Sequence, residues 1–169
     1  MDCMEAIRTR RSTRAFTQEK VPDEQVKQII EAGMYAPSAG NQQPWQFITI
    51  TDKNILKKVP DTHPYATMVP QVSVAILVCG DTSLEKFKGY WVQDCAAATQ
   101  NMLLAAHALG LGAVWTGVYP RQERVEGFRK LCKLPSHVVP LALLPIGYPA
   151  QKSGTAQRFK EDRIHNNTW

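Results

Sequence analysis

The run from Val72 to Cys79 constrains the fold most strongly, because every position except Ser73 is apolar. A run this short and this continuously apolar is typical of a β-strand buried on both faces. It is also less than half of the roughly 20 residues that a membrane-spanning helix needs. We therefore expect a β-sheet with other elements packed on both of its faces, and no membrane-spanning helix in this run.

Apolar periodicity predicts the remaining elements, with helices interleaved among strands. The predicted helices are 2–9, 22–34, 52–59, 90–109 and 121–132, and the predicted strands are 46–51, 72–79, 112–119 and 138–147. The segment 12–17 is expected to be extended, 36–45 to be a loop, and the chain from Pro60 to Pro70 to be irregular. On pattern alone, strands that alternate with helices favour a doubly wound parallel sheet.

Finer expectations concern which residues are buried. Met4 and Ile7 should point inward from the first helix, and Val26, Ile29, Ile30 and Met34 should form the apolar face of the second. The helix 90–109 has few polar groups and should be buried nearly all round. Two prolines, Pro140 and Pro145, make the last strand an edge or an irregular strand.

A length of 169 residues predicts a single domain over 1–169, with a polar segment at 150–169 as an arm that is disordered or docks, for instance on a second subunit. The N-terminus has no apolar stretch typical of a secretion signal, which favours the cytoplasm. Four separated cysteines without a C-x-x-C pair favour reduced thiols. The net charge of +5 favours an anionic partner.

Several familiar sites are excluded by their spacing. The chain has no P-loop motif and no G-x-S-x-G motif. Gly110, Gly112 and Gly117 miss the dinucleotide fingerprint, because the third glycine comes two residues late and the segment follows a helix. The four histidines are isolated and lack metal-ligand spacing, so we interpret each as structural or exposed and predict no metal site.

Arginines gather near the start of the chain, at Arg8, Arg10, Arg11 and Arg14. Guanidinium groups next to Ser12 could hold a phosphomonoester through bidentate hydrogen bonds. The cluster could equally be a solvated basic face. Nucleic-acid binding is permitted by the charge, but no aromatic residues interleave with the basic ones and no known nucleic-acid module is present.

Two further segments could contact a ligand. The loop from Ala36 to Trp45 carries three consecutive carboxamides beside a Pro-Trp pair, which suits the imide edge of a flat heterocycle. The strand that ends at Gly117 would let a ligand approach the backbone closely. The loop could also be an ordinary hydrophilic turn, and the strand end could simply be packed by a core Trp.

Together these motifs resemble the nitroreductase family. The resemblance rests on residues 8–16, 36–45, 110–117 and 163–167, in the family's order and spacing, and covers nearly the whole chain. It implies an α+β fold with a mixed, largely antiparallel sheet flanked by helices, and an intertwined homodimer whose C-terminal arm wraps the partner. The helix 90–109 would then lie in the dimer core. The resemblance therefore overrides the parallel sheet.

The resemblance also implies FMN as cofactor, bound at the subunit interface. The matching positions are Arg10, Arg11, Ser12, Arg14, Pro37, Ser38, Ala39, Asn41, Gln43, Thr116, Gly117 and Arg158. Arg10, Ser12 and Arg158 match the phosphate and ribityl end, and Arg14 matches a cation near N1 of the ring. Positions 37–41 come from the other subunit in the family, and Thr116 and Gly117 face N5. Ala156 replaces a basic companion of Arg158, for which Arg11 or Lys160 could compensate.

The activity implied is hydride transfer from NADH or NADPH to a nitroaromatic, a quinone or a similar acceptor, in ping-pong order. No catalytic side chain is expected, because the cofactor carries the chemistry. The chain is short for the family, which implies an open substrate site. The alternatives are a flavin-fragmenting or dehalogenating relative on the same fold, or a non-catalytic FMN-binding module.

Overall fold

The structure is a computed structural model that describes residues 1–151, 154 and 156–169. A five-stranded sheet has the order β1-β2-β5-β3, with β4 also paired to β5. The strands are β1 (Trp45–Ile50), β2 (Val74–Asp81), β3 (Gly112–Ala113), β4 (Thr116–Gly117) and β5 (Val138–Gly147). Every ladder between these strands is antiparallel, and a parallel bridge joins Ser12 to Ala113. The largely antiparallel sheet is confirmed.

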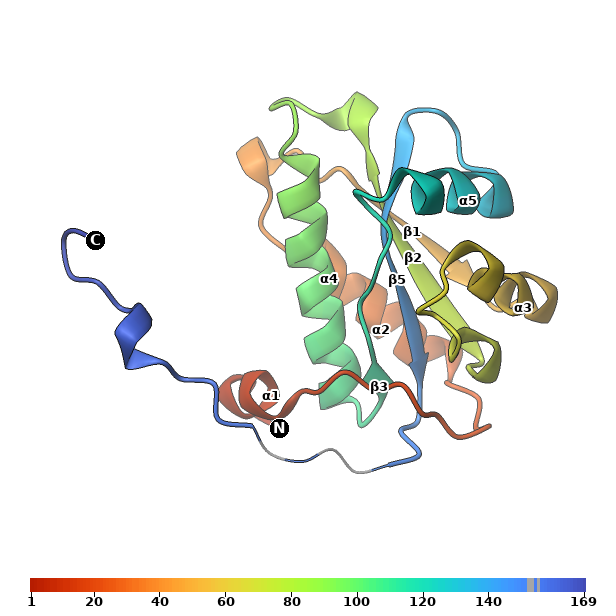
Figure 1. The fold of residues 1–169 in the computed structure, drawn as a ribbon, viewed down its shortest axis with the longest axis horizontal. Helices are drawn as coiled ribbons and strands as arrows, with labels where there is room; N and C mark the ends of the chain where they lie inside the picture. Colours follow the sequence, from red (N-terminus) through yellow and green to blue (C-terminus); the bar gives the residue numbers. More distant parts are fainter. Residues whose placement is uncertain (152–153, 155) are drawn as a thin grey trace.

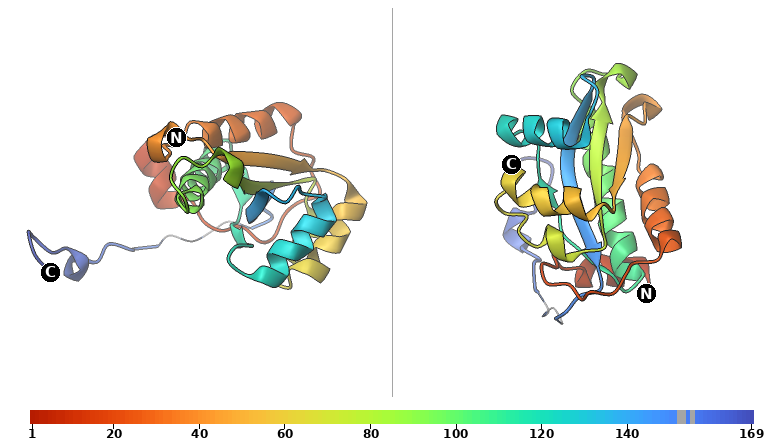
Figure 2. Two further views of the ribbon diagram at one scale, coloured as in Figure 1. Left: turned by 90° about the horizontal axis from the view of Figure 1, so that it is seen from above. Right: turned by 90° about the vertical axis from the view of Figure 1, so that its right-hand side faces the viewer.

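Helices cover both faces of this sheet, as Figure 2 shows. On one face lie α2 (Asp23–Met34) and α4 (Trp91–Ala108), packed on alternate residues of β2 such as Ile76 and Val78. On the other lie α3 (Lys53–Thr62) and α5 (Gln122–Cys132), packed on Ala75 and Leu77. Because side chains alternate along a strand, the continuous apolar run of β2 fills both cores.

The short helix α1 (Cys3–Thr9) differs from its prediction in orientation. It buries Ala6, whereas Met4 and Ile7 are about half exposed in the single chain. The prediction that Met4 and Ile7 point inward is therefore wrong. The same holds for Met34, which lies exposed at the end of α2.

The strand predictions are met in part. Of the two alternatives for the last strand, β5 is irregular and not an edge, because it lies between β2 and the pair β3 and β4. β5 accommodates its prolines through irregular pairing with its neighbours. On one side, the register with β2 shifts between Val78 and Cys79, next to Pro140. On the other side, β5 pairs with two short strands, β3 and β4, instead of one continuous strand. The predicted strand 112–119 is accordingly two short strands. Helix α3 also continues through Pro60 to Thr62, beyond its predicted end.

Helix α4 is buried less completely than its sequence predicts. Eight of its residues are buried, but Gln93, Gln100 and Ala108 are exposed and the rest are half-buried in the single chain. The C-terminal segment 150–169 is exposed wherever it is described and extends away from the body, with one 3-10 turn at Glu161–Arg163 (Figure 1). All four cysteines are free thiols. In the part of the chain that the structure describes, no helix has the length and apolarity of a membrane span.

Candidate functional site

Two of the arginines that match cofactor positions line one cavity, together with Arg8. Arg10, from the end of α1, and Arg158, from the C-terminal segment, border a space of about 670 Å³ together with Gln100. Burial lowers the pKa of Arg10, and the positive charges of Arg158 and then Arg11 lower it further. None of the ion pairs found among the described residues involves these arginines. Unneutralised, mutually repelling guanidiniums are suited to an anion with several oxygens, such as a phosphate.

Arg11 is directed elsewhere. Its Nη1 donates to the backbone oxygens of Arg8 (2.8 Å) and Arg10 (2.9 Å), and its Nε donates to Gly154 O (3.1 Å). It lines a different cavity of about 520 Å³. Arg11 therefore adds charge near Arg10 but has several donors already in use. Lys160 begins the 3-10 turn of the C-terminal segment and does not line the Arg10 cavity.

A second cavity, of about 650 Å³, brings together three more predicted residues: Arg14, Thr116 and Gly117. The extended segment that follows α1 places Arg14 there, because Ser12 pairs with Ala113 beside the sheet and the chain continues past it. Ser12 itself is exposed. An extended chain from Arg10 to Arg14 spans roughly 13 Å, which is the length of backbone that separates the arginines of the two cavities.

Thr116 and Gly117 are held rigidly at this cavity. Thr116 is buried and donates its hydroxyl to Leu143 O of β5 (2.7 Å). A Cβ built on Gly117 would meet nothing within 4 Å, which means that the glycine faces open space. A ligand could therefore approach the backbone closely here.

Sequence reasoning missed the residues behind Gly117. Both His63 and Arg124 contact its carbonyl oxygen, with distances of 2.9 Å to His63 Nε2 and 2.8 Å to Arg124 Nη1. Tyr65 lies beneath the guanidinium of Arg124, 5.5 Å from ring centroid to Cζ. All three line the same cavity as Arg14. Nothing in the spacing of an isolated His or Arg distinguishes these residues from surface ones, so the sequence held no usable signal.

The predicted loop is compact and specifically folded. It forms a 3-10 turn η1 (Ala39–Asn41), in which Gly40, Asn41 and, just beyond it, Gln43 have φ between +47° and +53°. Within the loop, Gln43 N donates to Ser38 Oγ (3.0 Å) and Gln43 Nε2 donates to Asn41 Oδ1 (3.0 Å). The side chain of Gln43 is therefore engaged inside the loop in this structure. Pro37 is exposed beside it.

A buried carboxylate anchors this loop to α4. Asp94 accepts from Ala39 N at Oδ1 (2.9 Å) and from Gln42 Nε2 at Oδ2 (2.6 Å). Gln42 Oε1 in turn accepts from the backbone of Lys86 (2.8 Å) and Phe87 (3.2 Å). Asp94 was absent from the predicted site, although its place as an acid in the first turn of a nearly apolar helix is a signal that could have revealed it.

The loop and the end of α1, which precedes Arg10, lie at opposite ends of α4. The loop contacts Asp94, whereas Thr9 at the end of α1 contacts His107 Nε2 (2.8 Å). The separation along α4 from Asp94 to His107 is roughly 20 Å, and Figure 1 shows η1 and α1 at the two ends of this helix. Neither the Arg10 cavity nor the Arg14 cavity contains residues 37–43. One chain therefore holds two separate parts of the predicted site.

In the described part of the chain there is no group of three His, Cys, Asp or Glu side chains placed to hold a metal ion. The fold and these cavities define an α+β protein with one cavity lined by Arg10 and Arg158 and another at an open strand end. Arginines of this kind suit a ligand that carries a phosphate.

Comparison with known proteins identifies the family. The model of the nitroreductase family matches residues 7–63 and 65–148, so the chain belongs to the nitroreductase family. A protein of Methanothermobacter thermautotrophicus named "Putative NADH dehydrogenase/NAD(P)H nitroreductase" is 53% identical over 169 residues, covering 100% of this chain and 88% of that protein.

Solved structures show the same fold. A crystal structure of a protein with that same name from Parabacteroides distasonis has a TM-score of 0.95 and 43% identity, covering 98% of each chain. A crystal structure from Desulfovibrio desulfuricans, described as a "putative nitroreductase in complex with fmn", has a TM-score of 0.85 and 36% identity, covering 98% of this chain and 96% of that one.

Proposed function

We propose that this protein is an FMN-dependent oxidoreductase that takes reducing equivalents from NADH or NADPH and passes them to a small acceptor. The observation that carries the proposal is that the guanidiniums of Arg10 and Arg158 share a cavity whose described lining includes no carboxylate. The relative named for NAD(P)H and the related structure with FMN support the same activity.

The residues present fit FMN in both charge and shape. Arg10 and Arg158 would hold the terminal phosphate, and Ser12 would lie beside the ribityl chain. Arg14 and the open strand end at Thr116 and Gly117 would receive the ring in the cavity of about 650 Å³. This places a fixed cation, Arg14, where negative charge develops when the ring is reduced.

FMN supplies the hydride chemistry when it is bound, accepting hydride from NAD(P)H and delivering it to the acceptor. The protein's own residues bind and orient: the arginines fix the phosphate and the strand end sets the distance to the ring. No acid or base from the chain is required in this scheme. We expect ping-pong order, because the nicotinamide must leave before an acceptor can occupy the same open face, and nitroaromatics or quinones suit that flat site.

A second copy of the chain would complete the site. Pro37, Ser38, Ala39, Asn41 and Gln43 lie at the far end of α4 from Arg10, so they can approach a bound ring only from a partner protomer. We interpret residues 1–169 as one domain whose arm, 150–169, wraps that partner.

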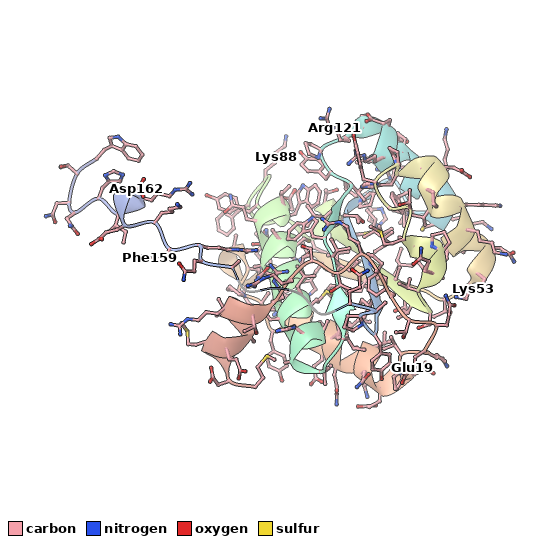
Figure 3. All side chains as sticks on the ribbon, turned by 60° about the horizontal axis from the view of Figure 1, so that its bottom comes forward. Glu19, Lys53, Lys88, Arg121, Phe159 and Asp162 are labelled. Carbon is pink, nitrogen blue, oxygen red and sulfur yellow. The ribbon has the colours of Figure 1, made fainter. Side chains whose placement is uncertain are left out.

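Unpaired apolar surface supports the homodimer. The half-buried outer side of α4 and the exposed side chains of Met4 and Ile7 have no cover in the single chain. Figure 3 labels Phe159 and Asp162 on the arm, away from the body. On this arm the side chains of Phe159, Ile164 and Trp169 are exposed. Burying such side chains against a second copy would stabilise the dimer.

Spectroscopy of the purified protein tests the proposal. We expect flavin absorbance with one FMN per chain, bleaching by NADH or NADPH without oxygen, and recovery of the colour when a quinone or nitroaromatic is added. A protein that takes up no added FMN would overturn the proposal. FMN that is bound but never bleached would indicate the non-catalytic module, and release of halide from a halogenated phenol would indicate the dehalogenating alternative.

A further inference from the structure

Three elements far apart in the sequence converge on one carbonyl oxygen. Gly117 lies in β4, His63 follows α3, and Arg124 lies on the first turns of α5. Arg124 Nη1 and His63 Nε2 both contact Gly117 O, and these two nitrogen atoms are 3.4 Å apart. A single backbone oxygen thus accepts from two side chains, one of them charged.

The contact determines how the strand end faces the cavity. Val118 N donates to Leu141 O of β5, so the neighbouring residue Gly117 is turned away from β5. In an extended strand the N–H and C=O of one residue point to the same side. Fixing the carbonyl of Gly117 therefore also fixes the direction of its N–H, on the side where the cavity lies.

His63 makes this contact as a neutral group. Its side chain is buried, and its pKa is lowered by burial, raised by the hydrogen bond to Gly117 and lowered again by Arg124. A neutral imidazole that donates from Nε2 leaves Nδ1 as an acceptor, and Nδ1 is buried without a partner among the described residues. His63 can thus restrain the strand end but adds no charge to the cavity.

Arg124 differs because it brings charge. Its guanidinium is half-buried over Tyr65, and none of the described ion pairs involves it. The described lining of the cavity includes two arginines, Arg14 and Arg124, and no carboxylate. In a partly desolvated pocket, a fixed cation without a counter-ion favours a bound group that gains negative charge.

We propose that Arg124 is a positioning residue that, with His63, fixes the Gly117 strand end against the flavin and is a second fixed cation favouring the reduced ring. The inference rests on the proposed function. It separates two roles: His63 acts on geometry alone, and Arg124 acts on geometry and on charge.

The charge role is tested by Arg124→Gln, which keeps an amide donor but removes the cation, and by Arg124→Lys, which keeps the cation. Arg121→Gln is the matched control, because Arg121 is exposed at the cap of the same helix and does not line the cavity. The midpoint potential of bound FMN is measured by spectroscopic titration against a reference dye. Arg124→Gln should bind reduced FMN roughly tenfold less tightly relative to oxidised FMN, seen as a more negative potential. Arg124→Lys and Arg121→Gln should stay near the parent value.

The geometric role is tested by His63→Leu, compared with His63→Gln, in which an amide nitrogen can replace Nε2. Fluorescence titration of apoprotein with FMN should show roughly two- to tenfold weaker binding for His63→Leu, with recovery in His63→Gln and an unchanged potential in both. Thermal unfolding of each apoprotein shows that the variants are folded. If Arg124→Gln does not fold, Arg124→Leu provides the neutral variant, since its aliphatic side chain can still cover Tyr65.

An unchanged potential in the neutral Arg124 variants would overturn the charge role, and unchanged FMN affinity in His63→Leu would overturn the geometric role. These outcomes differ from failure of the proposed function, in which the parent protein itself would take up no FMN.

Discussion

The strand end at Gly117 and the loop at η1 are both held by side-chain hydrogen bonds, but at different ends of the molecule. The strand end is restrained by His63 and Arg124 and faces a cavity in its own chain. The loop is anchored by Asp94 and borders neither that cavity nor the Arg10 cavity. This arrangement is the one that the proposed homodimer requires, in which the loop of one chain would complete the site of its partner.

The largest effect is expected from breaking the loop's anchor. Asp94→Ala would leave the buried side-chain amide of Gln42 without its acceptor, at a cost of about 1–3 kcal/mol, and would also remove the acceptor of the half-buried N–H of Ala39. Chemical denaturation should therefore show a clear loss in the free energy of unfolding, together with weaker FMN retention. Gln93→Ala, at an exposed position on the same helix, is the control. Equal stability of the two variants would show that Asp94 does not anchor the loop.

The second largest effect is expected from removing Arg10, the cation proposed to bind the FMN phosphate. Arg10→Ala should weaken FMN binding by about 1.5–3 kcal/mol, or roughly 10- to 150-fold, because a charge-assisted contact is lost. The apoprotein should keep its melting temperature, since Arg10 is repelled by Arg158 and Arg11 when no anion is bound. Titration of apoprotein with FMN measures the change. Parent-like affinity would exclude Arg10 from the phosphate site.

The open face of Gly117 gives a test that separates binding from folding. Gly117→Ala adds a methyl group that meets nothing within 4 Å in the protein, so the melting temperature of the apoprotein should not change. The methyl group would nevertheless protrude toward the ring and cost about 1–3 kcal/mol of FMN affinity, the usual range for overpacking. Gly112→Ala is the contrast, because its Cβ would lie 2.6 Å from Thr13 and should lower stability. Tight FMN binding by Gly117→Ala would place the ring elsewhere.

The smallest effect is a pH dependence at the strand end. Because the pKa of His63 is lowered in the folded protein, the unfolded chain binds a proton more readily. Stability should therefore fall as the pH drops through the ordinary histidine value of about 6.5. Thermal denaturation of His63→Gln should show a smaller fall in stability than the parent between about pH 7.5 and about pH 5.5. His107, whose pKa is also lowered, is present in both proteins and contributes to both curves. An identical fall in both proteins would remove His63 from this effect.

Much of the fold was predictable because apolar patterning determines it locally. The β2 run, the face of α2 with Val26 and Ile29, and α5 with Val125 and Phe128 follow directly from periodicity. Strand direction does not, and pattern alone favoured a parallel sheet. Pro140 and Pro145 predicted an edge or an irregular strand, and β5 is irregular, with a shift in register next to Pro140. Which of the two alternatives applies depends on the partner strands and cannot be read from β5 itself.

The site was predictable only where its residues lie close together in the sequence and form a recognisable motif. The arginines, the η1 loop and the Gly117 segment stand out by composition, whereas Asp94, His63 and Arg124 matter through contacts with residues far away in the sequence. Met4 and Ile7 show that apolar character alone can also predict too much. Their apolar character predicts burial, but the single chain does not provide the surface that would bury them.

The proposal that two chains share each site is tested most directly with heterodimers that carry Arg10→Glu and Pro37→Glu. With one substitution on each chain, one site keeps both its Arg10 and its loop, so a site shared between chains predicts one FMN per dimer. With both substitutions on one chain and a parental partner, each site is damaged once, and no tightly bound FMN is expected. The reverse stoichiometry, one FMN in the second heterodimer and none in the first, would show that each chain builds its site alone.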